Sequence, residues 1–286
     1  MLSIAQAARA VLLTADPRAK VKAARAAARH WRAGRLAWRF DVAMPDRPAR
    51  GDRPPLLPPS RMPKRGKAGS PATRIAMLHA LAHIEYVAID LAFDLVGRFG
   101  SANPRAFSDD WMKVASEEAM HFAILDRRLR ALGAAYGDLP AHDGLWEAAT
   151  VTAHDPLARL AIVPMVLEAR GLDVTPATVA RFEAAGDVAS ARLLDRIYRD
   201  EIGHVAAGVR WFESLCAAQR LVPALHWQAL VETYFRGVIK GPFNGSARDA
   251  AGLTKEFYEA VAVDGHGQQK RSASSREGQF PKTANS

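Results

Sequence analysis

The sequence is poor in the residue that makes covalent cross-links, because Cys216 is the only cysteine among its 286 residues. One thiol cannot form a disulfide within the chain, and it cannot build a thiolate metal site. No uninterrupted apolar stretch reaches the roughly 18 residues of a transmembrane helix, and the apolar run 10–13 is too short for a secretory signal. We therefore expect a cytoplasmic protein that makes no contact with a membrane.

The sequence also lacks the alternation of apolar and polar residues that predicts a half-buried β-strand, so the expected fold class is all-α. Residues 44–71 contain eight prolines and cannot hold a helix. Beyond them, apolar residues at helical spacing, capping residues and terminal glycines predict a series of helices. Their approximate ranges are 71–98, 108–132, 145–152, 156–171, 176–185, 187–219 and 223–237.

Acidic residues are scarce in the first 70 positions, which carry 16 Lys and Arg against 4 Asp and Glu. Residues 71–262 carry 19 against 24, so the net positive charge belongs to the N-terminal part of the chain. A basic segment of this kind can bind RNA or another polyanion, and it is equally typical of a solvated helix with an arginine-rich face. The pattern divides the chain into a basic amphipathic helical arm (1–43), a Pro-rich linker or strap (44–70), a helical bundle (71–262) and a disordered tail (263–286).

The bundle region contains the segment Glu-x-x-His twice, first at Glu118 and His121 and again at Glu201 and His204. Positions i and i+3 project from one side of a helix, so each pair can converge on a single ion. Two further glutamates, Glu85 and Glu168, lie in apolar helical runs, where an unpaired carboxylate is costly.

These residues form an internal repeat, because each isolated glutamate precedes its Glu-x-x-His segment by 33 residues. One glutamate from each of two helices and one Glu-x-x-His from each of two others is the ligand set of ferritin-like bundles. The sequence therefore predicts a ferritin-like antiparallel four-helix bundle with two metal ions held by all six residues. Glu118 and Glu168 are one pair that could bridge the ions, although the sequence does not assign the bridges.

Several neighbouring residues are candidates for lesser roles. Glu117 points about 100° away from Glu118 around its helix and is expected to be a charge on the outer face. Tyr198 precedes Glu201 by one turn and is a candidate hydrogen-bond donor to a ligating carboxylate. His79 and His83 are off the Glu85 face and are expected to be packing residues or to support the site from outside.

With these residues identified, the sequence resembles a bacterial family of ferritin-like proteins known as domain of unknown function 455. The stretches that carry the resemblance are His79–Glu85, Ser116–Phe122, Tyr136–Asp143, Leu167–Asp173, Asp200–Val205 and Gly241–Asn244. The sequence is more distantly similar to the di-iron tRNA hydroxylase of the ferritin-like superfamily. Both resemblances imply a carboxylate-bridged iron site at the six positions above, and neither implies a particular substrate.

The expected function is that of a non-haem di-iron carboxylate protein, an oxidoreductase that activates O2 to hydroxylate a small organic molecule. The expected cofactor is a pair of iron ions, with a mixed Mn/Fe pair as a variant. Two other functions use the same ligands: an iron-handling or peroxide-scavenging protein, and a nucleic-acid-binding module whose metal is structural. The sequence does not determine the oligomeric state.

Overall fold

The computed structural model describes residues 1–63 and 68–263, so the predicted tail lies almost entirely outside the described residues. The described part is all-α and contains no strand, only isolated bridges between extended residues. In chain order the helices are α1 (Ile4–Leu12), α2 (Pro17–Arg32), α3 (Pro71–Phe99), α4 (Arg105–Ala131), α5 (Gly144–Val151), α6 (Pro156–Ile162), the π-helical segment η3 (Val163–Glu168), α7 (Ala169–Ala184), α8 (Val188–Ala218), α9 (Pro223–Tyr234), α10 (Gly245–Ala250) and α11 (Lys255–Tyr258). The predicted fold class is confirmed.

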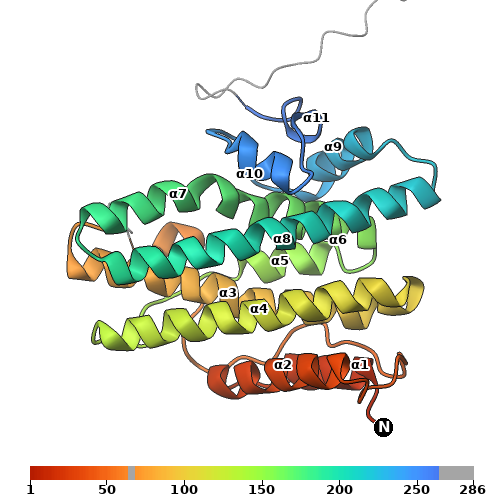
Figure 1. Ribbon diagram of the computed structural model, residues 1–286, viewed down its shortest axis with the longest axis horizontal. Helices are drawn as coiled ribbons and strands as arrows, with labels where there is room; N and C mark the ends of the chain where they lie inside the picture. The colour runs from red at the N-terminus through yellow and green to blue at the C-terminus, as the bar shows by residue number, and fades with distance from the viewer. Residues whose placement is uncertain (64–67, 264–286) are drawn as a thin grey trace, which may run out of the picture.

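Two helical hairpins form the centre of the molecule. Helices α3 and α4 form the first antiparallel hairpin. The continuous unit α6–η3–α7 and helix α8 form the second (Figure 1). The connection between the hairpins passes through α5 and spans the length of the bundle, because α4 ends at the opposite end from the start of α6 (Figure 1). This crossover makes α4 and α8 antiparallel neighbours in the middle of the bundle.

The helix starts follow from local chemistry. The Ser70 side chain accepts a hydrogen bond from the Thr73 amide at the start of α3, with proline in the first helical position. Asp16 caps α2 in the same manner by accepting from the Ala19 amide. Asp187 caps α8 by accepting from the Ser190 amide. The starts predicted at residues 71 and 187 agree with α3 and α8 to within one residue, because proline and capping residues are local signals.

One predicted boundary is wrong. We expected a helix to end near Gly171 and another to begin at Pro176, but α7 runs without interruption through both residues. Pro176 has no amide hydrogen, so the carbonyl of Leu172 one turn earlier loses its helical partner. The Asn244 side-chain amide donates to this carbonyl at 3.1 Å. The lost backbone bond is thus replaced from a segment about 70 residues further along the chain.

Helices α1 and α2 pack on the outside of the α3–α4 hairpin, while α9, α10 and α11 cover the α6–α8 side (Figure 1). Buried apolar residues form one cluster that runs from α1 to α11. The N-terminal segment is also fixed by charge, because the buried Asp90 on α3 pairs with Lys20 of α2 and with Arg50. Asp94, one turn further along α3, pairs with two arginines. Both aspartates are therefore committed to ion pairs away from the predicted metal site.

Helix α3 has the length and apolar composition of a membrane span, but 72% of its 18-residue most apolar segment is buried inside the protein. Its neighbours on two sides are α1 and α4. Its apolar composition is therefore that of a core helix.

Candidate metal centre

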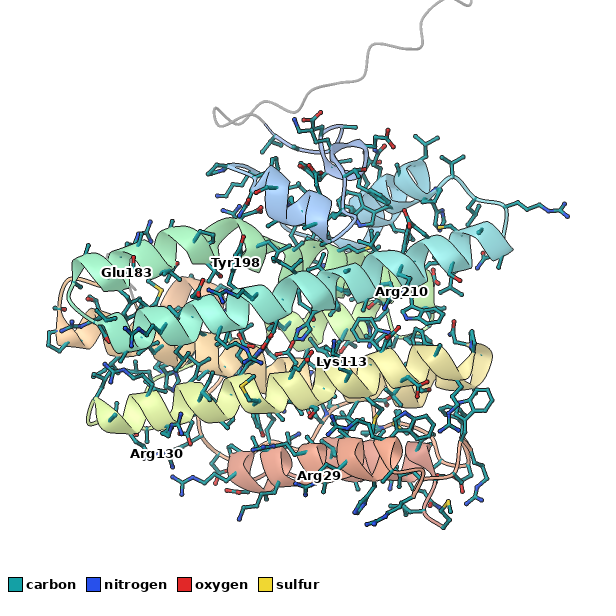
Figure 2. All side chains as sticks on the ribbon, viewed as in Figure 1. Arg29, Lys113, Arg130, Glu183, Tyr198 and Arg210 are labelled. Atoms are coloured by element: carbon teal, nitrogen blue, oxygen red, sulfur yellow. The ribbon has the colours of Figure 1, made fainter. Side chains whose placement is uncertain are left out.

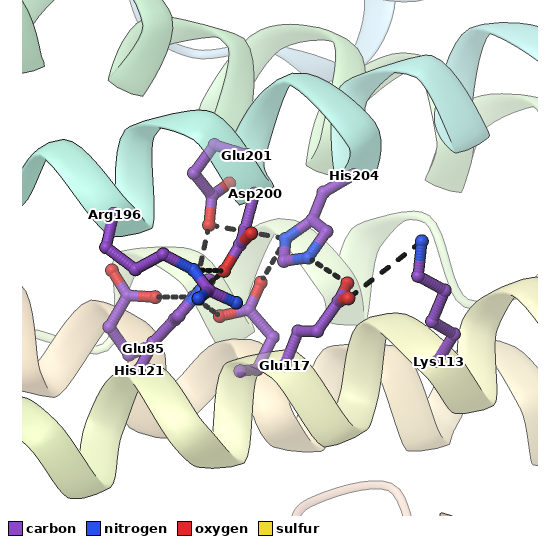
Figure 3. Close-up of polar contacts among 9 residues, drawn as sticks. Glu85, Lys113, Glu117, His121, Arg196, Asp200, Glu201 and His204 are labelled. Carbon is purple, nitrogen blue, oxygen red and sulfur yellow. Dashed lines mark hydrogen bonds and ion pairs between the residues drawn. The ribbon is translucent and has the colours of Figure 1, made fainter.

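Four of the predicted ligands converge where α4 faces α8. His204 Nδ1 lies 2.9 Å from Glu118 Oε1 and 3.3 Å from Glu201 Oε1 (Figure 3). His121 Nδ1 lies 3.5 Å from Glu118 Oε2 and 3.6 Å from Glu201 Oε1. All four residues can offer ligand atoms that lie within 4.8 Å of one another. Each carboxylate therefore stands between the two imidazoles.

The two isolated glutamates complete the cluster from the other helices. Glu85 of α3 approaches from the His121 side, with Oε2 3.2 Å from His121 Nδ1. Glu168 is the last residue of η3 and is close enough for the charges of Glu201, Glu118 and His204 to act on its pKa. The structure thus brings five predicted residues into direct contact and places Glu168 within electrostatic range of them, with three of the six residues from each hairpin.

Glu168 lies at the end of a π-helical segment. A π turn widens the helix by one residue and is found frequently at functional sites. Here it spans Val163–Glu168 between two regular helices, and it contains Pro164, which cannot donate a helical hydrogen bond. Helix α8 fits closely against it, because a Cβ added to Gly208 would lie 2.5 Å from Pro164 Cβ. Gly208 therefore allows α8 to pack closely against the segment that ends at Glu168.

Burial and mutual repulsion raise the pKa of the two carboxyl groups at the edge of the cluster. Burial raises the pKa of Glu85 well above its usual value, and the charge of Glu118 adds to the effect. Burial likewise raises the pKa of Glu168, together with the charge of Glu201. For Glu118 burial acts in the same direction, but the charges of His204 and His121 beside it outweigh burial and hold its pKa below the usual range.

The surrounding carboxylates raise the pKa of both imidazoles. Burial alone would lower the pKa of His121, but its contacts with Glu118 and Glu85 raise it well above its usual value. The pKa of His204 is also raised against burial, by the charges of Glu201 and Glu118. The four glutamates thus favour positive charge in the space between them, which is what a cation site requires.

The donor set fits divalent cations. Four glutamates and two neutral imidazoles carry four negative charges, which two divalent ions would balance. Three buried donor atoms also lack a hydrogen bond within the described residues: Glu118 Oε2, Glu168 Oε2 and His204 Nδ1. Buried polar atoms without partners are rare in folded proteins, and an ion in the cluster would satisfy these three. Carboxylate and imidazole together are the ligands that suit iron and manganese.

Two further carboxylates accept hydrogen bonds from the imidazoles on the side away from the cluster, and each of them comes from the helix opposite its histidine. Glu117 of α4 accepts a hydrogen bond from His204 Nε2 on α8 at 3.0 Å. Asp200 of α8 accepts one from His121 Nε2 on α4 at 3.1 Å (Figure 3). Each bond leaves the Nδ1 atom of its imidazole facing the cluster, which is the orientation that a ligating histidine needs.

The expectation that Glu117 is only an outer-face charge is therefore wrong. Its side chain lies at the edge of the α4–α8 interface and reaches across to the other helix. The sequence contained a signal for this role, because an acidic residue precedes the Glu-x-x-His segment in both halves of the chain. The repeat extends further, since Lys113 and Arg196 each contact the acidic residue four positions later.

Tyr198 does not have the partner that we expected. Its hydroxyl accepts a hydrogen bond from the Asn244 side-chain amide at 3.0 Å instead of supporting a carboxylate. Asn244 also binds the Leu172 carbonyl, so it ties α7 to α8 one turn away from Glu168 and Glu201. Tyr198 therefore belongs to the clamp that holds these two helices together.

His79 and His83 are packing residues. Both rings stack on Tyr136, and His79 Nε2 accepts the backbone amide hydrogen of Gly137 at 2.9 Å. His83 Nε2 donates a hydrogen bond to the His142 carbonyl, and its Nδ1 is hydrogen-bonded to the Tyr136 hydroxyl. These bonds fasten the connection after α4 onto α3 and leave neither imidazole available to the metal cluster.

The fold and the cluster define a class of protein: an all-α bundle with a buried carboxylate–histidine site at its centre that can hold a metal ion. The chain belongs to the family described as Protein of unknown function (DUF455), which matches residues 13–259. A protein of Haemophilus influenzae described as uncharacterized is 42% identical over 216 residues, which cover 73% of this chain and 75% of the relative. No solved structure matches the chain. The family predicted from the sequence is confirmed.

Proposed function

We propose that the protein is a ferritin-like, non-haem di-iron carboxylate protein that activates O2 to oxidise a small organic molecule. The observation that carries the proposal is the convergence of two Glu-x-x-His segments and two isolated glutamates from two repeated hairpins. Their four negative charges call for two divalent ions, and their donor types suit iron, with Mn/Fe as a variant. The single cysteine accords with a cytoplasmic location.

Two of the four glutamates lie between the imidazoles. Glu118 has one carboxylate oxygen toward each imidazole, and Glu201 lies near both imidazoles with one oxygen. Together with Glu85, beside His121, and Glu168, these residues would hold the ions.

A pair of ferrous ions held there would supply the electrons for reducing O2. The protein's own contribution is to hold the donor atoms in fixed positions and to keep them out of bulk water. His121 and His204 are almost completely buried, and each donates a hydrogen bond from Nε2 to Asp200 or Glu117, so each Nδ1 atom faces the site. Burial raises the pKa of Glu85 and Glu168, and a cation beside them would favour their ionised forms.

The test begins with metal-free protein that is loaded with ferrous ion under anaerobic conditions and then mixed with O2. We expect rapid O2 uptake with a transient visible absorption and, once a substrate is found, incorporation of ¹⁸O from ¹⁸O2 into the product. Continued iron uptake far beyond two ions per chain would favour the iron-handling alternative. Faster reaction with peroxide than with O2, without an oxidised organic product, would favour peroxide scavenging.

A further inference from the structure

The outward face of α2 carries a continuous line of positive charge. Its members follow each other at intervals of four, three, four and three residues, so they lie along one side of the helix. All are exposed, and α2 itself contains no acidic residue. We call this set the α2 stripe: Arg18, Lys22, Arg25, Arg29 and Arg32 (Figure 2 labels Arg29).

The charges of the stripe are largely free of intramolecular partners. Within residues 1–63 and 68–263, Lys22, Arg25 and Arg29 form no ion pair, and neither does Arg32. Arg18 alone has a carboxylate nearby, with its Nε 3.9 Å from Asp126. A sixth basic residue of α2, Lys20, points inward to Asp90 and contributes nothing to the surface. Four or five positively charged side chains are thus exposed to solvent without a carboxylate close enough to neutralise them.

The stripe is presented rigidly. The opposite face of α2 buries Val21, Ala24 and Trp31 against the α3–α4 hairpin. Trp31 is fixed by a hydrogen bond from Nε1 to Asp109 at 2.7 Å, and the guanidinium of Arg105 lies 4.3 Å from its ring centre. The basic segment is therefore a docked helix whose charges are pre-positioned, and a partner would not have to order it.

The geometry fits a linear polyanion. Successive cations are separated by three or four residues, which corresponds to about 5 Å along the helix axis. Four of the five are arginines, whose planar guanidinium groups bind phosphate oxygens in pairs. A membrane-binding amphipathic helix would have to insert its apolar face. That face of α2 is already buried in the protein, which favours a water-soluble polyanion over a lipid bilayer.

We propose that the α2 stripe is a docking surface for the phosphate backbone of nucleic acid. Helix α4 lies between α2 and α8, so the stripe and the metal centre are on opposite sides of α4 (Figure 1). The stripe therefore holds the backbone, without delivering a base to the metal ligands. This inference does not depend on the proposed oxidation chemistry, and binding should be the same with and without metal.

The experiment measures binding of the full chain to a fluorescein-labelled 20-nucleotide single-stranded RNA by fluorescence anisotropy, from 25 to 300 mM KCl. Contacts to four phosphates predict a slope of about −3 for log K against log salt concentration. The variant carrying Arg25→Ala and Arg29→Ala should bind at least about tenfold more weakly at 50 mM KCl and should lower the slope by about 1.4. Circular dichroism establishes that both proteins are folded.

A matched control removes the same amount of charge elsewhere. Arg192 and Arg199 are exposed arginines on α8, and replacing both by alanine should leave the affinity within about twofold. Equal losses from the two double variants would overturn the proposal, because binding would then follow net charge alone. The proposal would also be wrong if RNA failed to bind at 25 mM KCl while vesicles containing phosphatidylserine bound and lost binding with the α2 variant.

Discussion

Glu117 on α4 accepts a hydrogen bond from His204 Nε2 on α8 at 3.0 Å, so the residue beside one predicted ligand orients another ligand on the facing helix. Asp200 does the same for His121 in the opposite direction. Every imidazole in the cluster therefore has one nitrogen on an outer carboxylate and the other toward the inner glutamates. This reciprocity couples the geometry of the site to the packing of α4 on α8.

The first prediction concerns these outer carboxylates. Glu117→Gln and Asp200→Asn keep the size of the side chains but weaken the bonds that orient the imidazoles. Each should lower the affinity for ferrous ion by about 10- to 100-fold, measured by competition with a chromophoric chelator. Asp195→Asn is the control, since Asp195 is on α8 and pairs with Arg199 away from the cluster. Equal affinities for all four proteins would remove the outer carboxylates from the site.

The second prediction concerns the contact between α8 and the π-helical segment. Gly208→Ala places a methyl group against the Pro164 ring, and because the ring cannot swing away the helices must separate. We expect a loss of about 1–3 kcal/mol in the free energy of unfolding and weaker metal binding, because Glu168 moves away from α8. Gly203→Ala is the matched control on the same helix, where an added Cβ meets open space. It should leave metal binding unchanged and stabilise α8 by a few tenths to about 1 kcal/mol.

The third prediction concerns pH. His79 Nε2 accepts backbone hydrogen bonds and its imidazole is buried, and burial lowers the pKa of His79 below its usual value of 6.5. The unfolded chain therefore binds the proton first. The contribution of His79 to the free energy of unfolding is complete above pH 6.5 and is lost as the pH falls from 6.5 toward the lower pKa of the folded protein.

Chemical denaturation at pH 7.5 and pH 5.5 measures this loss in the free energy of unfolding. His79→Gln should be less stable than the wild type at pH 7.5, but its stability should fall by about 1 kcal/mol less on acidification. The same substitution at the exposed His30 should leave the pH dependence unchanged. An undiminished acid loss in His79→Gln would mean that His79 does not contribute to it.

The fourth prediction concerns the clamp between α7 and α8. Asn244 donates to the Leu172 carbonyl and to the Tyr198 hydroxyl, and its side-chain oxygen caps α10. Asn244→Ala should lower the free energy of unfolding by about 2 kcal/mol or more, because it leaves the Leu172 carbonyl without a partner. Ser246→Ala, which removes an exposed hydroxyl from the same turn, should cost no more than about 0.5 kcal/mol. Similar stabilities for the two variants would show that the clamp is dispensable.

Much of the site was readable in the sequence because the chain repeats itself. Glu85 and Glu168 were identifiable as partners of the Glu-x-x-His segments because each precedes its segment by the same number of residues. Within a segment, the fixed period of a helix places residues three apart on the same face. Glu117 was misjudged because its direction on α4 was compared only with Glu118. Its partner is on α8, and the distance between two helices is set by packing that a single sequence does not display.

Long-range partners also explain the remaining errors in the fold. Pro176 is a local signal for a helix boundary, but α7 continues through it. The Asn244 side-chain amide donates to the Leu172 carbonyl in place of the amide hydrogen that Pro176 lacks. The basic N-terminal helices were readable as amphipathic, but the sequence did not indicate which surface they pack on. That arrangement depends on contacts such as Lys20 with Asp90, whose partners are 70 residues apart.

The most direct test of the metal centre is the iron content of the chain. Protein purified without chelators and reconstituted with ferrous ion under anaerobic conditions is desalted, and iron per chain is measured by mass spectrometry. We expect two iron ions per chain in the wild type and a strong reduction in Glu118→Ala, since Glu118 lies between both imidazoles. A wild-type chain that retains only traces of iron, while remaining folded, would contradict the assignment of this cluster as a di-iron site.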